Sequence, residues 1–429
     1  MSQRADLHVD HHSLPGPNDI YREVLPNGIV VLARSNFSSP SVTISGYVRS
    51  GSLLDPDDKL GLADFTASAL LRGTARHTFD ELYNELESVG ASLGFDSGMT
   101  STGFHGHALA EDLGLLLGLL SEAMREPSFP RSEVEKLRAH LLAGLAIREQ
   151  DTADMADITF DEILYKNHPY ARAEDGNPTT IKAITRADLV RYHRHAFGPR
   201  GTAVAIVGAV EPKRAASLVR KALGDWKNPT QVEMPQVEEP RRLAETIRRH
   251  HVIAGKSQSD LIIGTNGPRR KDPDYLAASL GNSVLGQFGM MGRIGKSVRE
   301  KSGLAYYAYS NLSAGIGPGS WTVSAGVNPA NVAKAGEIIV KELQRFVKHA
   351  VSEEELGDSQ ANFIGRLPLS FESNAGVATA LMTMERHELG LDYYRLYDGK
   401  VRAVTREHVL EVARKYIDPE RLAIAVAGP

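Results

Sequence analysis

The chain of 429 residues contains no cysteine. Disulfides, thiolate nucleophiles, iron–sulfur clusters and cysteine-based zinc sites are therefore excluded, and the composition is compatible with a reducing compartment. Neither sign of charge is in excess, because 49 Lys and Arg stand against 53 Asp and Glu. A net charge of −4 is not typical of nucleic-acid-binding proteins, so we expect no nucleic-acid partner.

Long apolar runs are also lacking. No stretch approaches the ~18 consecutive apolar residues of a transmembrane helix, so we expect no membrane span. The residues before position 20 have no apolar core of the kind that a signal peptide carries. We therefore expect a cytoplasmic protein, or a periplasmic one if a leader was trimmed ahead of this sequence.

What the chain does contain is an internal repeat. Residues 181–208 (IKAITRADLVRYHRHAFGPRGTAVAIVG) match residues 401–428 (VRAVTREHVLEVARKYIDPERLAIAVAG) at a constant offset of 220 and without a gap. Each copy has a Thr that can cap an amphipathic helix, a Pro that ends the helix, and a strand that stops at Gly. Such a match indicates a duplication, and hence two related halves.

The earlier parts of the two halves also correspond. Alternating residues predict strands at 42–52 and 259–268, and a strand followed by a helix is predicted at 105–124 and again at 321–343. This pattern predicts an α+β fold with two homologous halves, each a mainly antiparallel sheet with helices packed on one face.

Composition also divides the chain. Three prolines and clustered charges mark a linker near the middle, and the first residues are typical of a loose arm. The predicted units are a flexible arm at 1–19, an N-terminal half at 20–228, a linker at 229–248 and a C-terminal half at 249–429.

Several segments resemble a known family when they are taken in order. They are GLADFTASALLRGT (61–74), FDELYNELESVGASLGFDSGMTSTGFHGHAL (79–109), KNHPYA (166–171) and VREKSGLAYYAYS (298–310). Together with the duplicated helix and strand, they resemble the pitrilysin/insulinase family of zinc peptidases, the inverzincins. The likeness runs from about Leu25 to Pro429, and it implies the two-halved fold of the mitochondrial processing peptidase type.

Active members of that family carry H-x-x-E-H on the helix that matches the first segment. Two imidazoles one helical turn apart hold zinc, and the Glu acts as general base. The corresponding residues here are Asp64, Ala67 and Ser68, and the register of the third ligand falls on Gly144. These residue types do not provide the nitrogen-rich set that zinc favours. We predict a degenerate site with no metal or other cofactor in this chain, and zinc in a partner subunit.

A second family feature is retained. VREKSGLAY places Arg299 and Tyr306 at the spacing of the pair with which family peptidases bind the substrate carbonyl. A guanidinium and a phenol can stabilise the oxyanion that develops on that carbonyl. The resemblance therefore implies that Arg299 and Tyr306 are catalytic residues. We call this pair the substrate clamp.

A third feature is the strand expected around residues 91–102. In the family, an edge strand at this place adds a substrate peptide as a further strand. The copy here reads GASLGFDSGMTST, and Gly94 and Phe95 depart from the family's usual residues. Gly94 and Phe95 are thus candidates for a substrate strand, with Phe95 able to fill space that a substrate would take.

A retained clamp beside a lost zinc site favours one hypothesis. The chain would be the non-catalytic subunit of a heterodimeric zinc metallopeptidase, inactive alone, with a partner that carries H-x-x-E-H. Its substrate would be a peptide or unfolded polypeptide, and the chain alone could form homodimers. The alternatives are a purely structural subunit like the core subunits of respiratory complexes, and a peptidase-like protein with displaced metal ligands.

Overall fold

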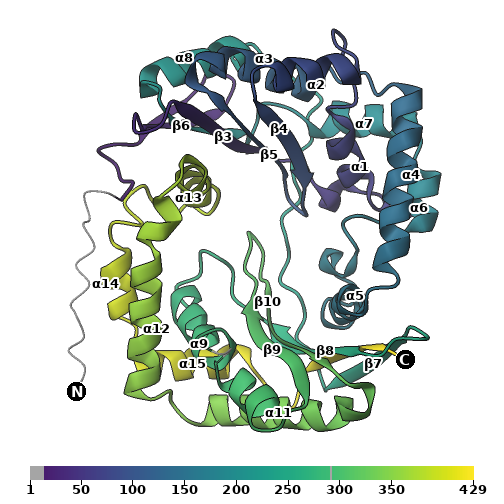
Figure 1. The fold of residues 1–429 in the computed structure, drawn as a ribbon, viewed down its shortest axis with the longest axis vertical. Coiled ribbons are helices and arrows are strands. Elements are labelled where there is room, and N and C mark those ends of the chain that lie inside the picture. The colour runs from purple at the N-terminus through teal and green to yellow at the C-terminus, as the bar shows by residue number, and fades with distance from the viewer. Residues whose placement is uncertain (1–13, 290–291) are drawn as a thin grey trace.

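Two β-sheets lie at opposite ends of the molecule, with helices around and between them (Figure 1). The computed structural model describes residues 14–289 and 292–429, and most of the predicted arm, residues 1–13, lies outside the described residues. Among the described residues, no helix is both long and apolar enough to cross a membrane.

The first sheet has six strands in the order β1-β2-β6-β3-β5-β4. Only β2 and β6 pair in parallel, and every other neighbouring pair is antiparallel. The strands are β1 (Tyr21–Val24), β2 (Val30–Ser35), β3 (Ser41–Val48), β4 (Ser92–Ser97), β5 (Thr102–Leu109) and β6 (Ala203–Gly208).

The second sheet has five strands in the order β7-β11-β8-β10-β9. Its one parallel pair is β7 with β11. The strands are β7 (Ile247–Val252), β8 (Ser259–Asn266), β9 (Ala305–Leu312), β10 (Ser320–Val327) and β11 (Ala423–Gly428). The predicted mainly antiparallel sheets are confirmed, and β7 begins inside the stretch predicted as a linker.

The internal repeat has the same structure in both copies. Helix α7 (Arg186–Ala196) precedes β6, and α15 (Arg406–Tyr416) precedes β11, so both elements start and end at positions 220 residues apart. The hydroxyls of Thr185 and Thr405 accept hydrogen bonds from the third backbone N–H of their helices. The predicted caps, helices and strands are therefore confirmed.

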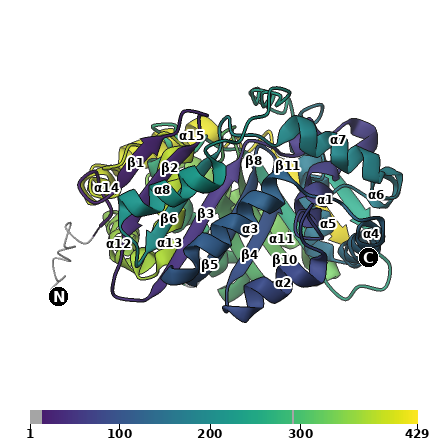
Figure 2. The same cartoon turned by 90° about the horizontal axis from the view of Figure 1, so that it is seen from above.

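Helices of each half cover the outer face of its own sheet (Figure 2). In the first half these are α2 (Phe79–Ser88), α3 (Leu113–Arg125) and α8 (Pro212–Leu223), and in the second they are α9 (Tyr275–Gly286), α11 (Val332–Lys348) and α15. The other helices are α1 (Leu62–Ala69), α4 (Arg131–Arg148), α6 (Pro178–Ala183), α10 (Gly292–Ile294), α12 (Glu353–Arg366) and α14 (Tyr397–Arg402).

The inner face of each sheet is covered by a helix that the other half contributes. Helix α13 (Asn374–Arg386) packs on β3 and β6, and α5 (Thr152–Leu164) packs on β8 and β11. Strand β6 consequently buries both faces, with Val204 and Ile206 toward the outer helices and Ala205 toward α13. This exchange, which the sequence analysis did not predict, interlocks the two halves.

Candidate functional site

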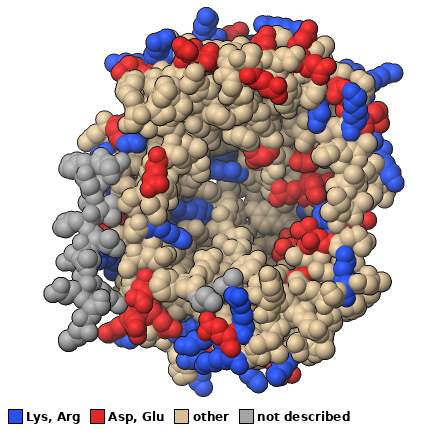
Figure 3. Space-filling model, in the orientation of Figure 1, with Lys and Arg blue, Asp and Glu red and all other residues tan. Residues whose placement is uncertain are grey.

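The middle of the molecule is hollowed, and its two walls differ in charge (Figure 3). Asp and Glu gather on the right-hand wall, near α1 and α5 in Figure 1, and Lys and Arg gather on the left-hand wall, toward α13. The degenerate zinc-site helix belongs to the acidic side.

Helix α1 does not present a zinc site. Asp64 and Ser68 are half-buried and Ala67 is buried, so the helix offers one carboxylate and one hydroxyl. Gly144 lies exposed on α4, and a Cβ built on it would meet no atom within 4 Å. Within residues 14–289 and 292–429, no group of three or more His, Asp or Glu is placed to hold a metal ion. The residues present therefore do not fit zinc, and the absence of a cofactor stays a prediction.

Carboxylates on α1, on α5 and on the segment just before α6 form what we call the acidic wall. Its members are Asp64, Asp154, Asp157, Asp161, Glu174 and Asp175.

Burial and mutual repulsion raise the pKa values of five carboxyl groups in this wall, those of Asp64, Asp154, Asp157, Asp161 and Glu174. Burial, with the charge of Asp175, raises the pKa of Asp64 to about 6. Burial, with the charges of Asp157 and Glu174, raises the pKa of Asp161 to about 7. A cationic ligand would relieve this repulsion. The sequence analysis missed the wall, although the spacing of Asp154, Asp157 and Asp161 places them on one face of a helix.

The segment that carries Arg299 is held at its start by an ion pair. Gly292, with a φ of 62°, begins α10 in a conformation that favours glycine. The guanidinium of Arg293 then donates to both carboxylate oxygens of Glu355 on α12, at 2.7 and 2.6 Å. The following π-helical turn, η5 (Gly295–Glu300), packs beside β9. Arg299, the next-to-last residue of this turn, is exposed.

Tyr306 is turned outward by an irregularity of β9. Ala305 pairs with Val327 and Tyr307 with Gly326, so Tyr306 is the extra residue of a β-bulge. Its side chain is 83% exposed. Within the described chain neither Arg299 nor Tyr306 has an ion pair or side-chain hydrogen bond, whereas the phenol of Tyr307 donates to Asp260. The structure thus brings the two clamp segments side by side, with both clamp side chains available.

Strand β4 is an edge of the first sheet. It hydrogen-bonds to β5 alone among the described strands. The exposed imidazole of His105 on β5 lies over Gly94, and a Cβ there would be 2.7 Å from its Nε2, so the imidazole would have to move to admit a larger residue. Phe95 packs against the core, with its ring centroid 6.4 Å from that of Phe104. The outer edge of β4 can accept an added strand, and the substrate role of Gly94 and Phe95 stays a prediction.

The Glu355→Gln variant is expected to be less stable than the wild type at neutral pH. The hydrogen bond from Arg293 lowers the pKa of Glu355 to about 2, below its unfolded value of 4.5. Its contribution is therefore complete above pH 4.5 and is lost as the pH falls toward 2. Thermal unfolding across this range should show the difference between wild type and variant shrinking.

The matched control for this prediction is Glu354→Gln, which removes an exposed carboxylate one residue away. It should change the melting temperature little at any pH. An equal loss in both variants would show that the pair with Arg293 does not stabilise the segment before Arg299.

Comparison with protein-family models matches both halves. The model described as "Insulinase (Peptidase family M16)" matches residues 30–173, and the model described as "Peptidase M16 inactive domain" matches residues 183–363. The two matches follow one another along most of the chain. The chain therefore belongs to the insulinase family of peptidases, M16, as a member without the H-x-x-E-H motif.

Individual relatives agree with this placement. An uncharacterized zinc protease of Streptomyces coelicolor is 25% identical over 96% of this chain and 90% of its own length. Bovine cytochrome b-c1 complex subunit 1 is 26% identical over 62% of this chain and 55% of its own length. The crystal structure of a peptidase M16 inactive domain from Pseudomonas fluorescens superposes with a TM-score of 0.89, at 24% identity, over 96% of this chain and 98% of that one.

Proposed function

We propose that this chain is the non-catalytic, substrate-clamping subunit of a heterodimeric zinc metallopeptidase. Its partner carries H-x-x-E-H and holds the zinc that activates water for peptide hydrolysis. This chain contributes Arg299 and Tyr306 to the partner's site. One observation carries the proposal. Both clamp side chains are exposed and form no ion pair or side-chain hydrogen bond in the described chain, while the helix at the family's metal site does not provide the ligands for zinc.

The chemistry of the clamp follows from its two side chains. When a nucleophile adds to the scissile carbonyl, negative charge develops on the carbonyl oxygen. The guanidinium of Arg299 and the phenol of Tyr306 each donate a hydrogen bond to that oxygen. Donors placed before the reaction need little reorganisation, so they stabilise the transition state more than the substrate.

The substrate is a peptide or an unfolded polypeptide. Strand β4 has an open edge onto which an extended chain can pair through backbone hydrogen bonds. Such pairing recognises the backbone of the substrate rather than its side chains. A folded protein would therefore have to unfold locally before its chain could pair with β4.

A second candidate function is a purely structural subunit. The observation that favours it is the similarity to cytochrome b-c1 complex subunit 1, a subunit of a larger assembly. The two functions differ in one respect. A structural subunit needs its contact surfaces but not the guanidinium of Arg299 or the phenol of Tyr306.

The proposed function is tested by reconstitution. This chain and an H-x-x-E-H chain from the same organism are purified separately, and each is assayed alone and mixed with a fluorogenic unstructured peptide. We expect no cleavage by this chain alone, and co-elution with strong cleavage in the mixture. Chelator-sensitive cleavage by this chain alone would favour displaced metal ligands. A stable complex without any gain in cleavage would favour the structural subunit.

A further inference from the structure

A cavity of about 390 Å³ lies between the two halves, against the segment that links them. Six separate stretches of the chain contribute to it: the end of β3, the turn between β4 and β5, the linker, the segment after β8, the turn between β9 and β10, and the end of α13. Its charged lining residues are Arg49, Arg269, Lys271, Arg386 and Glu388. Four cationic side chains thus meet a single carboxylate, and we call this space the basic cavity.

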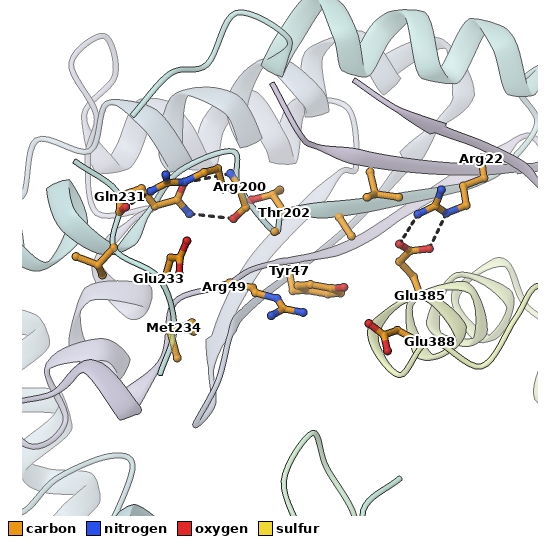
Figure 4. Close-up of a pocket in the computed structure, with 14 residues that line it drawn as sticks. Arg22, Tyr47, Arg49, Arg200, Thr202, Gln231, Glu233, Met234, Glu385 and Glu388 are labelled. Atoms are coloured by element: carbon orange, nitrogen blue, oxygen red, sulfur yellow. Dashed lines mark hydrogen bonds and ion pairs between the residues drawn. The ribbon is translucent and has the colours of Figure 1, made fainter. Parts of the chain in front are cut away.

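Two of its arginines, Arg49 and Arg386, form no ion pair within the part of the chain that the structure describes. Arg386 donates to the hydroxyl of Thr100 at 3.1 Å and lies 5.6 Å from the ring centroid of Tyr47. Arg49 also lines an adjoining cavity, which Figure 4 shows. In that cavity Arg22 pairs with Glu385, whereas no dashed line reaches Arg49. Arg49 and Arg386 come from different halves and repel each other, and the charge of Asp96 offsets only part of this effect at Arg386.

The electrostatics of the cavity point the same way. Burial is the main cause that lowers the pKa of Arg386; the charge of Arg49 acts in the same direction, whereas Tyr47 and Asp96 act against it. Burial, with the charges of Arg270 and Arg386, lowers the pKa of His387 to about 4, so its imidazole is neutral at pH 7. A bound anion would favour the charged forms of both groups and would offset the part of each shift that comes from neighbouring cations.

The remaining two cations are paired with acids at the surface. Lys271 lies 3.3 Å from Glu388, with both side chains more than half exposed, and Arg269 pairs with Glu239 of the linker. Exposed pairs of this kind are worth little and are easily exchanged for another anion. The cavity therefore keeps a net positive charge.

We propose that the basic cavity binds an oxyanion, and that its occupant is a carboxylate of the bound peptide, either the C-terminal one or an acidic side chain. Arginine favours this class of ligand because its planar fork matches the two oxygens of a carboxylate.

The inference rests on the proposed function for its choice of a peptide as the source. Thr100 lies in the turn that follows β4, whose edge is the proposed peptide strand, so a peptide paired there reaches the cavity within a short distance along the chain. The acidic wall on the opposite side of the hollow would attract the basic end of the same peptide (Figure 3). The hollow then selects peptides by the order of their charges.

Direct binding to the isolated full-length chain tests this inference. The probe is a fluorescein-labelled unstructured peptide that ends in Glu-Glu with a free carboxylate, and its counterpart ends in Gln-Gln-amide. Anisotropy titrations should show the acidic peptide binding about tenfold tighter or more. Arg386→Gln and Arg49→Gln should each remove most of that advantage, whereas Arg214→Gln, an exposed charge loss on α8, should not.

The arms of the experiment separate the possible outcomes. Inorganic pyrophosphate is titrated against the same variants and used as a competitor. If pyrophosphate binds with the same dependence on Arg386 but the acidic peptide does not, the peptide source is overturned. Equal affinity for the two peptides, with no effect of either arginine, overturns the site. If the Arg386→Gln variant does not fold, the affinity of the Arg49→Gln variant for the two peptides decides whether the site exists, because Arg49 is exposed and its loss should not affect folding. Neither partner nor cleavage is needed, so failure here is distinct from failure of the proposed function.

Discussion

Replacing Arg299 with Ala, or Tyr306 with Phe, is expected to lower kcat of the assembled complex by about 10²–10³-fold, while assembly stays intact. Each substitution removes one donor to the oxyanion of the transition state. Both side chains are exposed and have no ion pair or side-chain hydrogen bond in the described chain, so their loss should cost the fold little. Steady-state kinetics on the reconstituted complex should show the change in kcat rather than in KM.

Two substitutions nearby serve as matched controls. Tyr309→Phe removes a phenol from the same strand, and Lys301→Ala removes an exposed cation just after η5. Both should leave kcat within a few-fold of the wild type. If the clamp variants lost activity only because the complex dissociated, Arg299 and Tyr306 would be structural. A complex that cleaves normally without both side chains would make the purely structural subunit the better account.

Truncating the exchanged helix α13 at its centre is expected to destabilise the whole chain. Leu381 is fully buried between α13 and the inner face of the first sheet, in a cluster with Leu32 and Ala205. Leu381→Ala should cost about 2–5 kcal/mol of unfolding free energy, because it removes apolar contacts and leaves a cavity. Because α13 belongs to the second half and α5 covers the second sheet in return, both halves should lose stability together.

Chemical denaturation followed by fluorescence and circular dichroism measures this effect. Phe160→Ala on α5 is the equivalent change in the other exchanged helix and should give a loss of similar size. Leu369→Ala, at a side chain that is 64% exposed, is the control and should change stability by less than about 0.5 kcal/mol. Two resolved transitions, with only one shifted by Leu381→Ala, would show that the halves are not interlocked.

Much of the fold could be predicted because the internal repeat can be recognised in the sequence. The 220-residue offset predicted α7 with β6 and α15 with β11, including their Thr caps. The exchange of α5 and α13 could not be predicted. Periodicity shows that a helix has an apolar face, but it does not show which sheet covers that face. Here Leu381 shares a buried cluster with Leu32 and Ala205, which are far away along the chain.

The candidate site was predictable only in part for a similar reason. The motif around Gly303 singled out Arg299 and Tyr306, but the bulge that separates Tyr306 from its neighbours depends on pairing with β10. The basic cavity left no local signal, since Arg49 and Arg386 belong to different halves. The acidic wall on α5 did leave one, in its helical spacing of Asp residues.

The most direct test of the central claim is a distance between position 306 and the partner's metal. Because the chain has no cysteine, Tyr306→Cys creates a unique thiol for a small fluorophore. Lys213→Cys, exposed on the outer helix α8, gives the reference position. With Co²⁺ in the partner's H-x-x-E-H site, we predict strong quenching of the fluorophore at 306 on assembly and little at 213. Equal, weak quenching at both positions in a fully assembled complex would contradict a clamp that acts on the partner's zinc.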